Sequence, residues 1–301
     1  MNKKKKTVSL KLLPSEAASY ETVIAYISKA LAIGKKNITG FYFVKRSIDA
    51  RSKQVYINLS VLVFIDEPFI QRSVVPLSLK QVHQAKKSVI VVGAGPAGLF
   101  AALKLIEHGI KPIIIERGKD VRDRRRDLAA LNKEGIINPE SNYCFGEGGA
   151  GTYSDGKLYT RSTRRGSISR ILSIFVQFGA AENILYESHP HIGTNKLPGI
   201  ISAMREKIID CGGEFLFNTK LTDLIIKDDI VTAITTANQQ TLSADAYILA
   251  TGHSARDIFI MLHQKKISIE AKPFALGVRI EHPQLLIDTL QYHCAVRGEY
   301  L

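Results

Sequence analysis

The segment SVIVVGAGPAGLFAALKLIEHGIKPIIIERG, residues 88–118, decides the fold of this chain. Residues 88–92 form a continuous apolar run, which is typical of a parallel strand buried on both faces. Residues 96–109 predict a helix that begins with proline and ends with glycine. A second apolar strand follows at residues 111–115, so the segment predicts a β-α-β unit.

Three glycines between the first strand and the helix fit the dinucleotide-binding pattern G-x-G-x-x-G. Gly93 permits the tight turn, Gly95 lets a pyrophosphate approach the backbone, and Gly98 lets the helix pack closely on the strand. The helix start near Pro96 directs free amides and a positive dipole end toward the phosphates. We therefore predict a dinucleotide site rather than a glycine turn that only packs a helix on a sheet.

An acidic residue ends the second strand, as such a site requires. Glu116 lies 23 positions after Gly93, and the acid that binds the ribose hydroxyls usually comes about 20 residues after the first glycine. A carboxylate there also repels a 2′-phosphate, so the sequence disfavours NADP at this site.

A second glycine pattern, Gly146, Gly148 and Gly151, lies in the stretch GEGGAG. No buried strand precedes it, and Asp155-Gly156 predicts a turn after it instead of a helix. This stretch therefore lacks a helix start, but its exposed amides can lie against a large flat ligand. We expect the two glycine loops to serve one dinucleotide; the alternative is a structural cluster of turns.

The N-terminal part follows a different pattern. A strand at 7–13 and a helix at 15–34 precede a strand at 55–65 in which apolar residues strictly alternate, as on a half-buried strand. A further strand is expected at 41–48, which makes a small β-α-β-β unit.

At this point the sequence resembles the glutathione-reductase-like FAD flavoproteins. The resemblance is carried by the β-α-β segment, by GEGGAGTYSDGKLYT, and by ADAYILATGHSARD. The motifs KRSIDAR, HPHIGTNKL and FALGVRIEHPQ add a narrower resemblance to a family of bacterial FAD-dependent dehydrogenases, the NAD(P)/FAD-dependent oxidoreductases.

The resemblance implies that FAD is the cofactor. Glu116 would bind the adenosine ribose, the backbone near Leu221 would contact adenine, and the second glycine loop would lie near the pyrophosphate and flavin. The complete set of implied cofactor-binding residues is Gly93, Ala94, Gly95, Pro96, Ala97, Gly98, Glu116, Arg117, Gly148, Gly149, Thr152, Leu221, Thr251 and Gly252.

The resemblance also implies a domain plan of the α/β class. We expect a small α+β domain at 1–80, a Rossmann-like FAD-binding domain with a parallel sheet at 86–261, and the start of an incomplete substrate domain at 262–301. Related flavoproteins return to the FAD domain with another glycine-rich segment. Because this segment is missing here, we expect a C-terminally truncated chain.

The expected function is an FAD-dependent oxidoreductase that moves hydride through the flavin. Its partners would be a small-molecule substrate and NAD(P)H as a transient reductant, since no second β-α-β fingerprint is present. No catalytic residue stands out. A flavin-dependent RNA-modifying enzyme and a non-catalytic FAD-binding fragment are the alternatives.

Composition limits the partners and the compartment. The formal net charge of +13 favours an anionic partner. The three cysteines are far apart, which indicates a reduced chain without disulfides or a zinc site. The longest apolar run, at 61–65, is far shorter than the ~20 residues that cross a bilayer. We expect a cytoplasmic protein with no membrane span.

Other chemistry is less well supported. The arginines of residues 117–126 alternate with aspartates but not with aromatic residues, which predicts a solvated helix and disfavours nucleic acid. One or two of them could face the FAD phosphates. The stretch GHSAR lacks the second glycine of a nucleophile elbow. His189 and His191 have no third ligand nearby, so no metal is expected.

Overall fold

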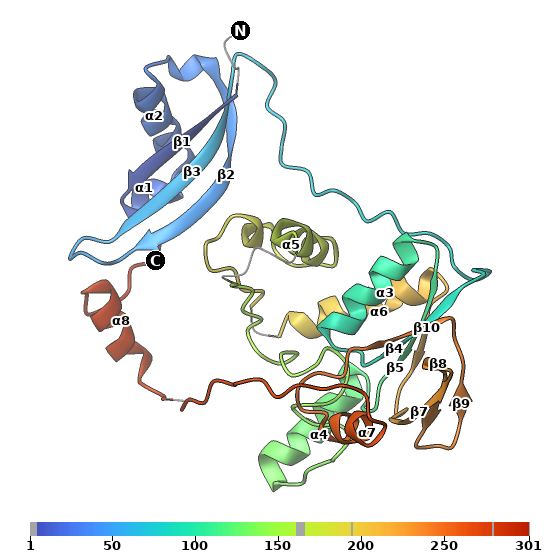
Figure 1. Ribbon diagram of the computed structural model, residues 1–301. Coiled ribbons are helices and arrows are strands. Elements are labelled where there is room, and N and C mark those ends of the chain that lie inside the picture. The colour runs from blue at the N-terminus through green and yellow to red at the C-terminus, as the bar shows by residue number, and fades with distance from the viewer. Residues whose placement is uncertain (1–4, 161–165, 194, 279, 301) are drawn as a thin grey trace.

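A computed structural model of the chain describes residues 5–160, 166–193, 195–278 and 280–300. It confirms the α/β fold with a parallel sheet (Figure 1). The four parallel strands run in the order β10 (Ala246–Leu249), β4 (Ser88–Val92), β5 (Lys111–Ile115) and β6 (Glu214–Leu216).

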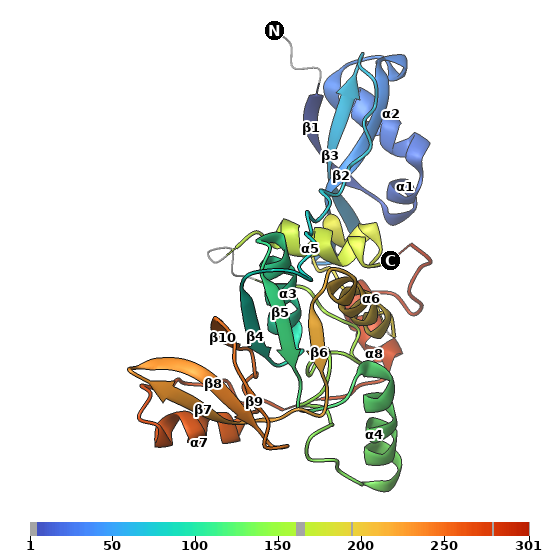
Figure 2. The same ribbon diagram turned by 90° about the vertical axis from the view of Figure 1, so that its right-hand side faces the viewer.

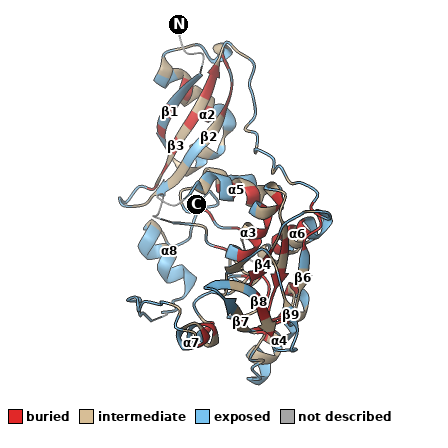
Figure 3. Ribbon diagram, turned by 45° about the vertical axis from the view of Figure 1, so that its right-hand side comes forward, coloured by how far each residue is buried: buried red, intermediate tan, exposed pale blue. Residues whose placement is uncertain are grey.

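Both faces of this sheet are covered, which explains the continuous apolar run of β4. Val89 and Val91 belong to the core formed with α3 (Pro96–Glu107) and α6 (Leu197–Asp210). Ile90 and Val92 belong to a second core on the opposite face. Four of the five β4 residues are buried, and Figure 3 colours buried residues red in this sheet. The second core is closed by α7 (Arg256–Gln264) and by a three-stranded antiparallel sheet of β7 (Leu221–Lys227), β8 (Ile230–Thr236) and β9 (Thr241–Leu242).

The N-terminal residues form a separate antiparallel sheet in the order β1-β3-β2, with helices on one face. The prediction of one helix over 15–34 was wrong. Ser19 interrupts it and caps the second helix, because its hydroxyl accepts a hydrogen bond from the Thr22 amide at 3.2 Å. The second helix ends at Leu31, and Ala32 has a left-handed conformation. The elements are β1 (Lys5–Leu12), α1 (Pro14–Ala18), α2 (Tyr20–Leu31), η1 (Lys35–Asn37), β2 (Ile38–Asp49) and β3 (Tyr56–Ile65).

A short segment of the larger part lies beside β2. The Arg46 amide donates to the Tyr186 carbonyl at 2.8 Å, and the Ser188 amide donates to the Arg46 carbonyl at 2.9 Å. These bonds attach the small sheet, which stands beyond α5 in Figure 2. The remaining elements are α4 (Val121–Glu134), α5 (Ile168–Gln177), η2 (Glu182–Leu185) and α8 (Gln284–Tyr292). Within the described ranges, no helix has the length and apolarity that crossing a bilayer requires.

Candidate dinucleotide site

A cavity of about 500 Å³ lies at the carboxyl ends of β4, β5 and β10. Ligands bind at this edge in open parallel sheets. Most of the residues predicted to hold the cofactor line it. They are Gly93, Gly95, Pro96, Ala97, Glu116, Arg117, Gly149, Leu221, Thr251 and Gly252.

The three glycines of the first loop lack side chains for different reasons. Gly93 has φ +108°, and a Cβ there would stand 2.5 Å from the Ala250 carbonyl oxygen. A Cβ on Gly98 would overlap the Gly93 carbonyl oxygen, so α3 could not pack on β4. At Gly95, φ is −74° and the nearest atom to a Cβ is the Gly149 Cα, 3.9 Å away. The protein itself therefore does not require glycine at position 95, although it faces the cavity.

Helix α3 begins at this loop. Gly95 is the N-cap residue, Pro96 opens the helix, and no side chain caps it. The first amides of a helix have no acceptor within the helix. Pro96 has no N–H, so the free amides of this helix start begin at Ala97. Because Ala97 lines the cavity, the uncapped end of α3 offers these amides and its positive dipole end to an anion.

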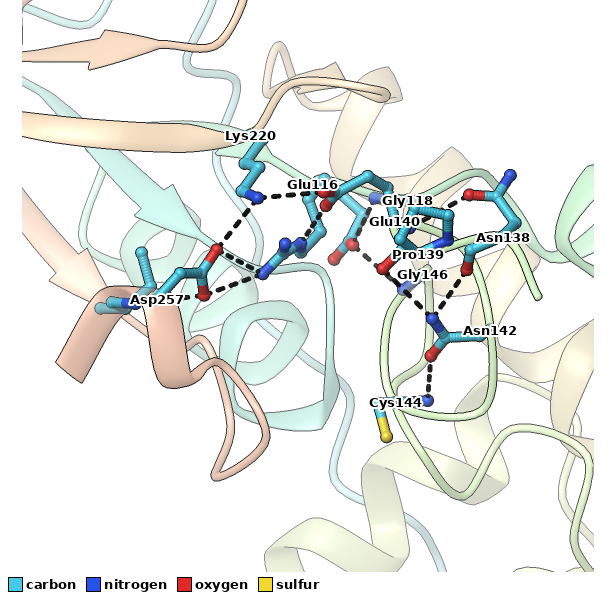
Figure 4. Close-up of polar contacts among 12 residues, drawn as sticks. Glu116, Gly118, Asn138, Pro139, Glu140, Asn142, Cys144, Gly146, Lys220 and Asp257 are labelled. Carbon is cyan, nitrogen blue, oxygen red and sulfur yellow. Dashed lines mark hydrogen bonds and ion pairs between the residues drawn. The ribbon is translucent and has the colours of Figure 1, made fainter. Parts of the chain in front are cut away.

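Glu116 joins the two glycine loops. Its side chain is buried, and its carboxylate accepts hydrogen bonds from the amides of Ala94 at 2.8 Å, Gly118 at 2.8 Å and Gly146 at 3.1 Å. Figure 4 shows Glu116 next to Gly118 and Gly146. The carboxylate still lines the cavity, where its remaining lone pairs can accept from hydroxyl groups.

The second glycine loop packs directly on the first. The Gly148 amide donates to the Ala94 carbonyl at 2.9 Å, and a Cβ on Gly149 would stand 3.1 Å from the Pro96 side chain. The structure thus brings both glycine patterns to one cavity. Four predicted residues lie outside the lining: Ala94, Gly98, Gly148 and Thr152.

Thr152 requires a correction, because we expected it beside the ligand. It is fully buried beneath the loop, and its hydroxyl donates to loop carbonyl oxygens, at 2.9 Å to Gly149 and 3.1 Å to Glu147. Its side chain stabilises the loop from behind.

Arg124 of α4 is the residue that sequence reasoning missed. We expected its helix to be solvated, but the Arg124 side chain is fully buried and lies behind the second glycine loop. A Cβ on Gly146 would collide with it. Its guanidinium donates, over 2.7 to 3.3 Å, to the carbonyl oxygens of Asn142, Tyr143, Gly146, Glu147 and Gly149 and to the Thr152 hydroxyl.

Charged side chains pair beside the cavity; the partners Lys220, Glu140 and Asp257 are drawn in Figure 4. Lys220 contacts Glu140 at 2.9 Å and Asp257 at 3.1 Å, and Arg117 contacts Asp257 at 3.0 Å. Arg117 also bonds Glu140 and stacks on Phe145 at 4.0 Å. Burial raises the pKa of Glu140, but hydrogen bonds from Arg117 and Lys220 hold that pKa below its usual value. Both cations are therefore neutralised by carboxylates.

Glu147 is a second buried carboxyl group in the loop region. One oxygen accepts from the Val121 amide at 2.9 Å and from Arg205 at 2.7 Å. The other oxygen has no hydrogen-bond partner among the described residues. Burial raises the pKa of Glu147 to about 7, although the charge of Arg205 opposes this shift.

The other candidate groups lie elsewhere or lack a third ligand among the described residues. Within the described ranges no cluster of three potential metal ligands exists, and the His189 ring packs on Tyr159 with centroids 4.6 Å apart. Ser254 lies 3.4 Å from the His253 ring nitrogen at the cavity wall, where both residues are exposed or half-buried.

Comparisons with known proteins place the chain in a family. Residues 87–268 match the family described as pyridine nucleotide-disulphide oxidoreductase, and residues 4–64 match a domain of unknown function. An uncharacterized protein of Clostridium beijerinckii is 41% identical over 280 residues, which cover 88% of this chain and 52% of that protein. A thiamine thiazole synthase of Aeropyrum pernix is 28% identical over 185 residues, 56% of each chain.

Among solved structures, the THI4 protein of Thermovibrio ammonificans is similar with a TM-score of 0.38 and 18% identity, covering 60% of this chain and 62% of that one. The chain spans about half the length of the curated relatives named above. The family that residues 87–268 of this chain match indicates a flavin or dinucleotide cofactor.

Proposed function

Because this chain belongs to the pyridine nucleotide-disulphide oxidoreductase family, we propose that its cavity binds FAD and that it acts as a flavin-dependent oxidoreductase. The observation that carries the proposal is the space at Gly95. Apart from its chain neighbours, the nearest atom of the described residues to a Cβ at that position is the Gly149 Cα, at 3.9 Å. Glycine at such a position is accounted for by a ligand that lies against the backbone.

The features of the cavity match the adenosine and pyrophosphate half of the ligand. The start of α3 supplies amides for two phosphates, Glu116 can accept from ribose hydroxyls, and Leu221 supplies an apolar surface for adenine. FAD and NAD share this half. We choose FAD because the resemblance to FAD flavoproteins extends to the second glycine loop.

The charges disfavour a ligand with a 2′-phosphate. The Glu116 carboxylate would repel that phosphate. Arg117 and Lys220 do not offset this repulsion, since both are paired with Glu140 and Asp257. We therefore propose FAD at this cavity, with NAD(P)H acting only as a transient reductant.

The side chains would bind and orient the cofactor. Bound flavin supplies the hydride-accepting and hydride-donating chemistry. Gly93 and Gly149 would shape the backbone around the pyrophosphate, and Thr251 and Gly252 would cover the dinucleotide. We assign no acid or base, because flavin chemistry does not require one from this part of the chain.

The test is to purify the chain, measure its flavin absorbance, and add NADH or NADPH without oxygen. We expect a bound flavin whose absorbance bleaches with a nicotinamide donor. Dithionite is the control, because it reduces any bound flavin. Flavin that only dithionite reduces would favour a non-catalytic FAD-binding chain. A chain that binds NAD but not FAD would overturn the proposed cofactor.

A further inference from the structure

We propose that Arg124 is a positioning residue of the ligand site. It holds the second glycine loop around its guanidinium and places a buried positive charge directly behind the backbone that faces the pyrophosphate. This inference rests on the proposed function, since it takes the ligand to be an adenine dinucleotide.

The side-chain hydrogen bonds of Arg124 are confined to one loop, and its guanidinium also lies over the ring of Tyr153 at 5.5 Å. Every acceptor that it bonds lies between Asn142 and Thr152, and most are backbone carbonyl oxygens. None of the ion pairs found among the described residues includes Arg124. The nearby carboxylates of Glu116 and Glu147 act on it only at longer range. An arginine keeps its charge even when buried, so a cation lies inside the protein without a direct counter-ion.

The peptide between Gly149 and Ala150 links this cation to the cavity. Its carbonyl oxygen accepts from Arg124 at 2.8 Å. The C=O and N–H of one trans peptide point in opposite directions, so the Ala150 amide points away from the guanidinium. Gly149 and Ala150 line the cavity, whereas Arg124 does not. In the described part of the chain, the Ala150 amide has no backbone acceptor.

The backbone conformation of the loop depends on the same contacts. Gly148 has φ +81° and Gly149 has φ +73°. Their own amides donate to the carbonyl oxygens of Ala94 and Gly146, so the Ala150 amide is the donor of this turn that has no backbone acceptor in the described part of the chain. The buried positive charge of Arg124, on the carbonyl side of the Gly149–Ala150 peptide, strengthens the attraction of the Ala150 amide for phosphate, because little water screens it there. Arg124 therefore fixes both the backbone conformation and the electrostatic potential of the cavity wall formed by Gly149 and Ala150.

A neighbouring arginine, Arg126, provides a matched control for the substitution of Arg124. Arg126 lies on the same helix, but its side chain is 84% exposed and pairs with Asp123 at 2.9 Å. The experiment compares Arg124→Met and Arg124→Lys with Arg126→Met. Adenosine and ADP are the probes, since they differ by the pyrophosphate. Hydrogen exchange of the amides at 142–152 in the ligand-free protein measures how stably the second glycine loop is held.

We expect Arg124→Met to weaken ADP binding by about 100-fold and adenosine binding far less. Exchange at 142–152 should rise about ten-fold or more, while α3 stays protected. Arg124→Lys should also loosen the loop, because one ammonium donates at most three hydrogen bonds, but it should largely restore the preference for ADP over adenosine. Arg126→Met should change neither measurement.

Two results would overturn the inference: loop exchange as slow as in the wild type, or an unchanged ratio of ADP to adenosine affinity in Arg124→Met. If that variant does not fold, the loop exchange of Arg124→Lys decides instead, and wild-type protection there overturns the inference. A wild-type chain that binds neither ADP nor FAD would overturn the proposed function and the charge effect together. The exchange result would still decide whether Arg124 holds the loop.

Discussion

The Glu116 carboxylate accepts a hydrogen bond from the Gly146 amide at 3.1 Å, which ties the end of β5 to the second glycine loop. The same carboxylate accepts from the amides of Ala94 and Gly118, each at 2.8 Å. Three buried donors thus depend on one side chain, and both glycine loops keep their relative position because of it.

Replacing Glu116 with glutamine should therefore destabilise the protein even without ligand. The amide group of glutamine would face buried N–H donors, which costs about 1–3 kcal/mol for each unmatched group. Urea unfolding of the flavin-free protein measures this loss. Glu206→Gln is the control, because Glu206 is exposed on α6. Equal stability of the two variants would show that the carboxylate does not hold the loops together.

Gly98→Ala should be far more damaging than Gly95→Ala. A methyl group at 98 would overlap the Gly93 carbonyl oxygen, and backbone atoms cannot move aside at low cost. A methyl group at 95 would only touch the Gly149 Cα at 3.9 Å, an ordinary van der Waals distance. We expect Gly98→Ala to lose about 3 kcal/mol or more of unfolding free energy and Gly95→Ala to lose about 1 kcal/mol or less. Thermal and urea unfolding of the flavin-free variants check the order, and a reversed order would refute the packing argument.

The contribution of Glu147 to the stability of the protein should fall as pH rises from about 4.5 to about 7. Burial raises the pKa of Glu147 from 4.5 to about 7, so the folded state retains a proton that the unfolded state releases. Between about pH 4.5 and 7 the folded state binds more protons, and stability therefore falls with rising pH and then levels off. The loss attributable to this group is on the order of 3 kcal/mol.

Glu147→Gln should remove this part of the pH dependence, because the amide remains neutral. The unfolding free energy is measured at about pH 5 and at about pH 8. The decrease between these two pH values should be smaller in the variant than in the wild type, by roughly the loss attributed to Glu147 above. Parallel pH profiles for the two proteins would contradict a raised pKa at Glu147.

The charges beside the cavity should control discrimination against a 2′-phosphate. Glu140 neutralises Arg117 and Lys220. In Glu140→Gln these two cations lose that negatively charged partner, so more of their positive charge can act on a ligand. We expect the variant to bind adenosine 2′,5′-bisphosphate relatively better than ADP, by about two- to five-fold, since partly exposed pairs are weakly coupled. Competition with labelled ADP measures the ratio. No change in the ratio would mean that these cations do not face the ribose.

The sequence was sufficient to predict the β4-α3-β5 unit, because a continuous apolar run, a glycine pattern and a well-placed proline all point to one structure. It also led us to expect both glycine loops at one cavity, and the structure brings them there. Hydrophobic periodicity did not locate the break at Ser19, where a local hydroxyl–amide bond overrides the helical pattern.

The burial of Arg124 was missed for a different reason. Its helix is rich in charges of both signs, which is typical of a solvated surface. A signal was nevertheless present, because Val121, Arg124 and Leu128 have helical spacing and all three are buried. The contacts that bury Arg124 come from loop carbonyl oxygens, and no side-chain pattern in a sequence records where those oxygens point.

FAD binding by the Gly95→Val variant tests the central claim most directly. The wild-type flavin-free chain should bind FAD, and Gly95→Val should remain folded but bind FAD about 100-fold more weakly or worse, because its side chain enters the space assigned to the pyrophosphate. Titration of FAD into both proteins, with circular dichroism to confirm folding, gives the answer. Wild-type FAD affinity in a folded Gly95→Val variant would contradict the placement of the dinucleotide in this cavity.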